Sequence, residues 1–328
     1  MTVALPDSRV IRDAVMLACR APSLHNSQPW RWVAERATLH LWADPSRLMP
    51  GTDHSGRELT LSCGAVLDHL RVAMAAAGWE SIIERFPDPH RADHLATVQF
   101  RPAEAVSEAQ QRRADAILRR RTDRLPFAAP SGWVRLEPLL RDAVKSHDVM
   151  LDVVADDARQ GLAEASRLTE TLRRYDTSYQ AELRWWTSPF TLNTGVPQGA
   201  MVSSSEAARV DVAREFPPAG GGRRRAGTEF DHSKILVLST PHEDAPLDVL
   251  RCGEAMSAAL LECTVAGMAT CTLTHMTEVA PSREIIRQLI GQRGLPQVLI
   301  RVGRPPARDE HVAPTTRRPL TDVLEFRS

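Results

Sequence analysis

The feature that most constrains the fold of this chain is a long apolar segment that occurs twice. Residues 61–79 read LSCGAVLDHLRVAMAAAGW, and residues 250–268 read LRCGEAMSAALLECTVAGM. Leu, Cys-Gly and Ala-Gly coincide at one separation of 189 residues. Apolar residues recur at helical spacing in both, and each has a Gly where a helix would end. Strand-like runs follow at 95–102 and 296–305. The pattern favours an internal duplication over a chance likeness of two helices.

Helices and strands are expected to mix without regular βαβ alternation, which favours an α+β fold over a doubly wound parallel sheet. The first half is predicted to contain a helix over about 8–20, a two-stranded hairpin in WRWVAERATLHLWAD (30–44), a helix over about 57–77 and a strand around 95–101. The second half is predicted to contain a helix over 108–121, a strand over 149–155, a helix over about 157–185, a strand over 234–240, the repeated helix, a short helix near 281–290 and a final strand.

These elements predict two tandem copies, 1–107 and 108–328, each with a mainly antiparallel sheet packed by helices. The second copy is longer because of a span between about 186 and 230, which Pro, Gly and Ser punctuate. Loops of this length are usually functional covers or disordered. The aromatic residues at its start favour a lid that packs over a site, whereas GGGRRRAG (220–227) favours a mobile insertion. Both interpretations stay open at this point.

Composition excludes some classes of function. Lys+Arg 41 balances Asp+Glu 41, so no global field attracts nucleic acid or an anionic membrane. We expect no signal peptide, because charges interrupt the N-terminal apolar residues, and no run of about 18 apolar residues predicts a membrane span. The five cysteines are scattered and form no CxxC pair. They indicate buried, reduced thiols in a cytoplasmic protein.

Four short motifs carry a family resemblance. After the first predicted helix, APSLHNSQPW (21–30) resembles the PS-x-x-N-x-Q-P-W signature of the FMN-dependent nitroreductase family. LRRRTDRLPF (118–127) is similar to that family's R-x-[ST]-x-[RK]-x-F element, with one more residue before the Phe. AGMATCTLT (266–274) resembles its G-[LM]-x-[ST]-x-P-[IL] segment, with Thr272 in place of the Pro. TTRRPL (315–320) resembles its C-terminal basic tail.

The motifs are divided between the two predicted copies. The PS-x-x-N turn is in the first copy, whereas the R-x-T-x-R element and the Arg tail are in the second. In ordinary members of the family one subunit of a homodimer supplies the turn and the other supplies the arginines. The resemblance therefore implies a homodimer fused into one polypeptide, an internal pseudo-dimer that keeps one composite FMN site. This arrangement resembles the two-copy, Acg-like branch of the family.

The resemblance implies the cofactor-binding residues one by one. The FMN phosphate dianion requires multidentate cations and hydroxyl donors, and arginine forms such contacts well. Arg124 would lie near the flavin ring, where a cation stabilises the reduced flavin, and Asn26 offers both a donor and an acceptor. Backbone N–H groups near Thr274 and His275 could face the flavin. The remaining candidates are Arg120, Arg121, Thr122, Arg317 and Arg318 for the phosphate, and Pro22, Ser23 and Leu24 for the ring.

Other interpretations of single residues are weaker. Without the family pattern, RRRTDR would indicate a solvated helix end. His25 beside Ser23 suggests Ser–His catalysis, but no GxSxG elbow accompanies it. Cys271 and His275 lack a second ligand pair, so no metal is expected. Arg57 and Glu58 are expected to form an ion pair at a helix N-terminus, and Trp30 and Trp32 to pack in the core beneath the turn.

The function implied is hydride transfer from NAD(P)H through FMN to a nitro or quinone-like acceptor, with no side chain required as a catalytic acid or base. The alternative is an FMN-binding or storage protein with little turnover, because the 186–230 span could cover the flavin. A fused pseudo-dimer already contains the family's dimer interface, so we expect a monomer.

Overall fold

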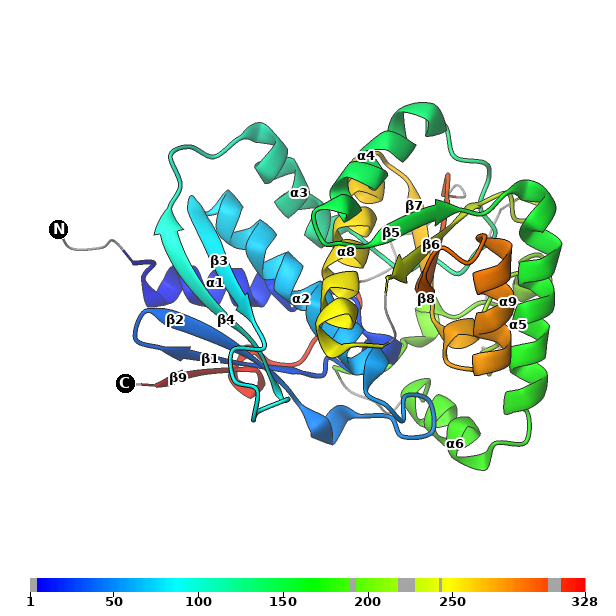
Figure 1. The fold of residues 1–328 in the computed structure, drawn as a ribbon, viewed down its shortest axis with the longest axis horizontal. Helices are drawn as coiled ribbons and strands as arrows, with labels where there is room; N and C mark the ends of the chain where they lie inside the picture. The colour runs from blue at the N-terminus through cyan, green and yellow to red at the C-terminus, as the bar shows by residue number, and fades with distance from the viewer. Residues whose placement is uncertain (1–4, 189–192, 218–227, 242–243, 306–313, 328) are drawn as a thin grey trace.

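The computed structural model describes residues 5–188, 193–217, 228–241, 244–305 and 314–327. Within these residues the chain forms two β-sheets with helices between and around them (Figure 1). The helix α2 (Arg57–Ala76) and the helix α8 (Pro246–Val265) run through the middle of the molecule. The predicted α+β class is confirmed.

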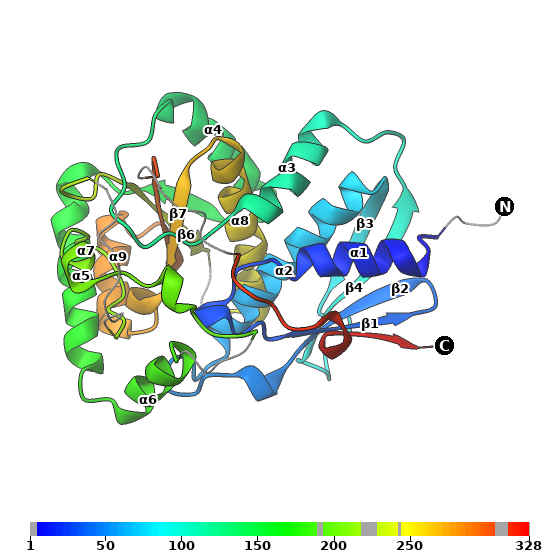
Figure 2. The same ribbon diagram turned by 180° about the vertical axis from the view of Figure 1, so that it is seen from behind.

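The first sheet combines the N-terminal half with the end of the chain. Its strand order is β3-β4-β2-β1-β9, and all pairs are antiparallel except β1 with β9. The helix α1 (Ser8–Ala18) lies beside it (Figure 2). The C-terminal strand thus completes the sheet of the first half. The strands are β1 (Trp30–Glu35), β2 (Thr38–Ala43), β3 (Trp79–Arg85), β4 (His94–Pro102) and β9 (Leu324–Arg327).

The second sheet is wholly antiparallel and buried on both faces. Its order is β5-β6-β8-β7. The apolar run ILVL (235–238) does not alternate with polar residues, because Leu236 and Leu238 join the core beside α8 while Ile235 and Val237 pack on the opposite side. The strands are β5 (Met150–Val153), β6 (Lys234–Thr240), β7 (Ala269–Leu273) and β8 (Leu295–Gly303). The opposite face is covered by α5 (Arg159–Arg173) and α9 (Ala280–Leu289).

Some elements differ from the sequence prediction. The helix predicted over about 157–185 is two helices, α5 and α6 (Thr177–Trp186), because Asp176 caps a new helix by accepting from the Tyr179 N–H at 3.0 Å. The strand β3 and the helix α4 (Trp133–Lys145) were not predicted. The helix α3 (Glu108–Arg119) ends before Arg120. A short helix, α7 (Ser204–Ala207), lies within the 186–230 span.

The two central helices cross in backbone contact. A Cβ placed on Gly64 of α2 would lie 2.1 Å from the Leu250 carbonyl oxygen, and one on Gly253 of α8 would lie 2.1 Å from the Leu61 carbonyl oxygen. The contact is reciprocal, because Leu61 and Leu250, like Gly64 and Gly253, are separated by the 189 residues that separate the two repeated segments. Only glycine allows two helix backbones to approach this closely.

A buried polar contact extends the crossing. Ser257 Oγ donates to Asp68 Oδ2 at 2.6 Å and contacts His69 Nδ1 at 2.8 Å. Burial opposes ionisation of Asp68, but the Arg71 guanidinium and the Ser257 hydroxyl hold the pKa of this carboxyl below its ordinary value. Asp68 and Ser257 are again separated by 189 residues. Equivalent positions of the repeat therefore meet where the helices cross.

Burial also accounts for the apolar character of α2. It is the one helix in the described residues long and apolar enough to cross a membrane, and 72% of its apolar window is buried inside the protein. This is the burial expected of a core helix. All five cysteines are free and buried, as predicted: Cys19, Cys63, Cys252, Cys263 and Cys271.

Gly64→Ala should destabilise the chain strongly. The new methyl group would overlap a backbone carbonyl of α8, and overpacking of this kind costs about 1–3 kcal/mol, more than the roughly 1 kcal/mol that Ala gains in a helix. We expect chemical denaturation to show a lower free energy of unfolding. Gly199→Ala is the control, because a Cβ there meets nothing within 4 Å. Equal stability of the two variants would contradict the contact.

Candidate functional site

Two adjoining cavities lie where the two halves of the chain meet. The first has a volume of about 600 Å³ and the second about 380 Å³, within the usual size range of small-molecule sites. Six residues line both: Pro22, Ser23, His25, Thr122, Arg124 and Val202. The cavities therefore form one continuous candidate site, with walls from both halves of the chain.

The turn that follows α1 forms one wall in an uncommon backbone conformation. His25, Asn26 and Gln28 have φ values of 47°, 59° and 52°, in the left-handed region that non-glycine residues seldom occupy. The Gln28 N–H donates to Ser23 Oγ at 2.9 Å, and the Leu24 N–H donates to Ser62 Oγ of α2 at 3.2 Å. Such strain persists where surrounding contacts impose it, as in many binding sites.

The core beneath the turn fixes it further. Trp30 and Trp32 are fully buried, which confirms their predicted place in the core. Arg57 and Glu58 form the predicted ion pair at the start of α2, and Glu58 also lines the first cavity.

The opposite wall begins where α3 ends. Arg120 leaves the helix with ψ 131°, and the extended chain pairs with β7, where the Asp123 N–H donates to the Thr270 carbonyl at 2.9 Å. This pairing carries Arg120, Arg121, Thr122 and Arg124 past the turn. All four line the second cavity.

The C-terminal tail closes the same region. The Arg318 N–H donates to Gln28 Oε1 at 2.8 Å, and the Arg317 guanidinium donates to the carbonyls of Cys19 at 2.9 Å and Arg20 at 3.0 Å. Three segments far apart in the sequence therefore meet at one cavity.

Five arginines line the second cavity. Arg124 also lines the first cavity, and the other four form a cation cluster: Arg20, Arg120, Arg121 and Arg317. Burial and the neighbouring Arg20 lower the pKa of Arg120 to about 10. Burial, with Arg120 and Arg20, lowers the pKa of Arg317 to about 9. Like charges held together in a poorly solvated place produce such shifts.

Most members of this cation cluster have no carboxylate partner in the part of the chain that the structure describes. Within the described ranges, no ion pair joins Arg20, Arg120 or Arg317 to a carboxylate; their bonds go to backbone carbonyls. The buried Arg120 Nε has no hydrogen-bond partner among the described residues. A multidentate anion, such as a phosphate group, is the ligand that this arrangement fits.

Arg20 was not among the residues predicted from the sequence. It lies two positions before Pro22 and just beyond the end of α1, where a single arginine is typical of an ordinary helix end. The only signal in the sequence is its position beside the turn. Its part in the cluster depends on Arg120 and Arg317, which come from distant segments.

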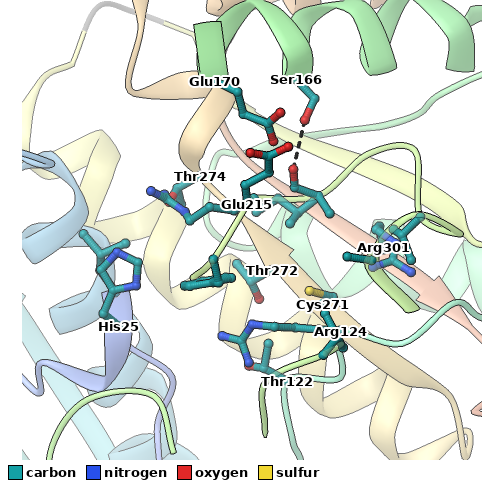
Figure 3. A pocket seen from close by; sticks show the side chains of 18 of the residues that line it. His25, Thr122, Arg124, Ser166, Glu170, Glu215, Cys271, Thr272, Thr274 and Arg301 are labelled. Atoms are coloured by element: carbon teal, nitrogen blue, oxygen red, sulfur yellow. Dashed lines mark hydrogen bonds between the residues drawn. The ribbon is translucent and has the colours of Figure 1, made fainter. Parts of the chain in front are cut away.

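The first cavity is less cationic. Figure 3 shows Arg124 and Thr122 beside Thr272, with His25 on the facing side. The Arg124 guanidinium lies over the Phe216 ring, 4.8 Å from its centroid, and burial lowers its pKa. Leu24 and Thr274 line this cavity, while Asn26 lines the second.

Two predicted residues have side chains outside these cavities. Arg318 donates to the Gln28 carbonyl at 3.1 Å and pairs with Asp44 at 3.3 Å, so its guanidinium braces the turn from behind. His275 Nε2 contacts Ser166 Oγ at 2.9 Å. The His275 side chain lines a third cavity, of about 330 Å³.

The remaining sequence candidates have other surroundings. Burial lowers the pKa of His25 well below its ordinary value, and its ring lies edge-on to Phe216 at 5.8 Å. Ser23 Oγ accepts from Gln28 and supports the turn. Burial raises the pKa of the Cys271 thiol. Neutral His25 and protonated Cys271 fit a wall of the cavity better than a nucleophilic centre.

Residues 193–217, the described middle of the 186–230 span, pass over both cavities. Val196, Pro197 and Val202 line the second cavity, and Val210 and Phe216 line the first. The Arg214 guanidinium fastens this segment: it pairs with Glu278 and donates to Tyr179 Oη at 3.0 Å. The GGGRRRAG stretch (220–227) lies outside the described residues.

Comparisons with known proteins agree with the motifs. No protein-family profile matches the chain. A Mycobacterium tuberculosis protein named "Putative NAD(P)H nitroreductase acg" is 53% identical over 328 residues, covering 99% of each chain. Another M. tuberculosis protein, described as uncharacterized, is 57% identical over 322 residues, covering 97% of this chain and 93% of its own.

The chain belongs to the nitroreductase family, in its Acg-like branch. A further M. tuberculosis protein with an NAD(P)H nitroreductase name is 36% identical, covering 99% of this chain and 94% of its own. Among solved structures, a nitroreductase with bound FMN from Desulfitobacterium hafniense has a TM-score of 0.39 at 11% identity, covering 62% of this chain and 94% of its own.

Inorganic phosphate should stabilise this nitroreductase-family chain through the cation cluster. A ligand that binds only the folded state raises stability, and we expect thermal melting of the ligand-free protein to rise by about 2–4 °C in saturating phosphate relative to chloride at equal ionic strength. Arg120→Gln should remove the increase. Arg119→Gln, an exposed neighbour on α3 outside the cavities, should retain it. An undiminished increase in Arg120→Gln would contradict the assignment.

Proposed function

We propose that this chain is an FMN-binding oxidoreductase with one composite flavin site, which transfers hydride from NAD(P)H through the flavin to a nitro or quinone-like acceptor. The observation that carries the proposal is the cation cluster at the second cavity, in which Arg20, Arg120 and Arg317 have no carboxylate partner among the described residues. Membership of a family whose named relatives are NAD(P)H nitroreductases supports the same conclusion.

The residues fit FMN in kind and in distribution. Arg20, Arg120, Arg121 and Arg317 would hold the phosphate, since their charges surround one cavity and the Arg120 Nε is free to donate. Thr122 and Asn26 supply polar groups beside it. Pro22, Ser23, Leu24 and the Thr274 backbone would border the ring in the first cavity. When bound, FMN supplies reversible acceptance of a hydride.

Arg124 has a separate role in the proposal. Its guanidinium lies between the phosphate cluster and the first cavity, and lines both spaces. There it would provide positive charge to a reduced, anionic ring. Burial keeps His25 neutral and the Cys271 thiol protonated, so neither is assigned a catalytic role, and the proposed hydride transfer relies on orientation and charge at the ring.

We also propose that the chain is an internal pseudo-dimer of copies 1–107 and 108–328, monomeric and cytoplasmic. Reciprocal contacts between equivalent positions support the duplication: Gly64 with Gly253, and Asp68 with Ser257. The addition of β9 to the first sheet resembles the exchange of a tail between subunits. Five free, buried thiols support a reducing compartment.

A second function, FMN binding or storage with little turnover, is supported by a specific observation. Residues 193–217 line both cavities, and Phe216 lies against His25 and Arg124 in the first. An aromatic ring in that place would compete with a nicotinamide for the space beside a flavin. In this alternative the 193–217 segment is a lid that retains the cofactor.

FMN binding predicts a yellow protein whose affinity depends on the turn. Asn26→Ala should weaken FMN binding by about fivefold, because a hydrogen bond to a polar ligand group is worth about 1 kcal/mol. Titration of the ligand-free protein, followed by quenching of flavin fluorescence, measures the change. Gln111→Ala, which removes an exposed amide on α3, is the control. A colourless protein with no affinity for FMN would refute the proposed function.

Anaerobic reduction separates the two functions. Excess NADPH or NADH mixed with FMN-loaded protein should bleach the visible flavin absorption within seconds if the chain is an oxidoreductase, because typical turnover is about 1–10³ s⁻¹. Stopped-flow absorbance follows the change, and dithionite provides the fully reduced reference. A flavin that dithionite bleaches but nicotinamides leave yellow would support storage and contradict the enzyme.

A further inference from the structure

Two carboxyl groups face each other in the wall of the first cavity. Glu170 comes from α5 and Glu215 from the 193–217 segment, and Figure 3 shows their carboxyl groups directed at one another. Both residues line the first cavity and also the third. The pair therefore forms part of the wall between these two cavities and joins the segment to the helix beside it.

Two carboxylates in this position cannot both carry a charge without repulsion. Burial, the charge of Glu215 and a hydrogen bond with Glu215 raise the pKa of Glu170 to about 8. At neutral pH one proton is therefore shared, and it converts repulsion into a hydrogen bond, as in other close carboxyl pairs.

The surrounding charges do not neutralise the pair. Arg167 on α5 lowers the pKa of Glu170 only in part. Arg214 is committed to Glu278, Arg173 pairs with Asp176, and burial keeps His275 neutral. No ion pair joins Glu170 or Glu215 to a cation within the described ranges. The other charged groups lining the two cavities are Glu58, Arg124, Arg174, Arg184, Asp211 and Arg301.

We propose that the Glu170–Glu215 pair is a proton-operated latch, which fastens residues 193–217 to α5 and thereby controls the access of small molecules to the first cavity. The proposal adds regulation to the proposed function and rests on it only for the identity of the molecules admitted. The Arg214–Glu278 ion pair anchors the segment nearby. The carboxyl pair is the fastening that can be released.

The direction of the pH effect follows from the shift. In an open state Glu170 would regain an ordinary pKa of about 4.3, so the closed state binds more protons between about pH 4.3 and 8. Closure is therefore strongest in acid and weakens as the pH rises through this window. Above about pH 8 the equilibrium between the closed and open states no longer changes with pH.

Hydrogen exchange followed by mass spectrometry tests the latch in the full-length protein as purified. Peptides covering 204–216 should lose about tenfold in protection between pH 5.5 and 8.5, after division by the intrinsic exchange rate. Peptides from β8 provide the internal reference. This measurement does not require flavin or turnover, so a colourless protein would refute the proposed function and still leave the latch testable.

Three variants distinguish the pair from its surroundings. Glu170→Gln keeps a hydrogen-bond donor and removes the charge, so protection should stay high at every pH. Glu215→Gln should behave in the same way and serves if the first variant folds poorly. Glu164→Gln, exposed on the same helix, should keep the wild-type pH dependence. A wild-type protein without pH dependence, or a dependence that persists in both pair variants, would overturn the latch.

Discussion

The contact between Gly64 and Gly253 is the constraint on which the rest of the structure depends. It brings α2 and α8 together at backbone distance and so fixes how close the two sheets lie. The same helices form the floor of the site: Ser62 of α2 holds the turn through Leu24, and Met256 of α8 lines the first cavity. A wider crossing would separate the turn from the segment that follows α3. The helix contact and the candidate site are thus two consequences of one close approach.

Charge at the second cavity opposes this close packing. The fold places Arg20, Arg120 and Arg317 together with no paired carboxylate among the described residues, and the depressed pKa values of Arg120 and Arg317 reflect the cost. Backbone carbonyls compensate in part. An anionic ligand would remove the remaining repulsion, so binding and stability are linked in this region. The strained turn opposite the cluster fits the same description of a site whose geometry is maintained for a ligand.

The sequence predicted much of the fold because its strongest signals are local. Both repeated helices, the β1–β2 hairpin and strand β6 appear close to their predicted bounds, since hydrophobic periodicity and end signals specify them. Strand β3 was missed because only two residues separate it from α2 and because its sequence WESIIER does not alternate between apolar and polar residues, although its burial does. The break between α5 and α6 depends on a single cap, Asp176, within a run that is otherwise helical.

The residues of the site were predicted segment by segment, because the motifs matched one family position by position. How those segments come together depends on the tertiary structure. Sequence alone determined which residues could bind an anion or line a ring, since side-chain chemistry and turn composition are local properties. Only the fold decided that Arg20 joins the cation cluster, that Arg318 turns away to brace Gln28, and that Glu170 meets Glu215. These outcomes depend on contacts between residues far apart in the chain, which no local pattern specifies.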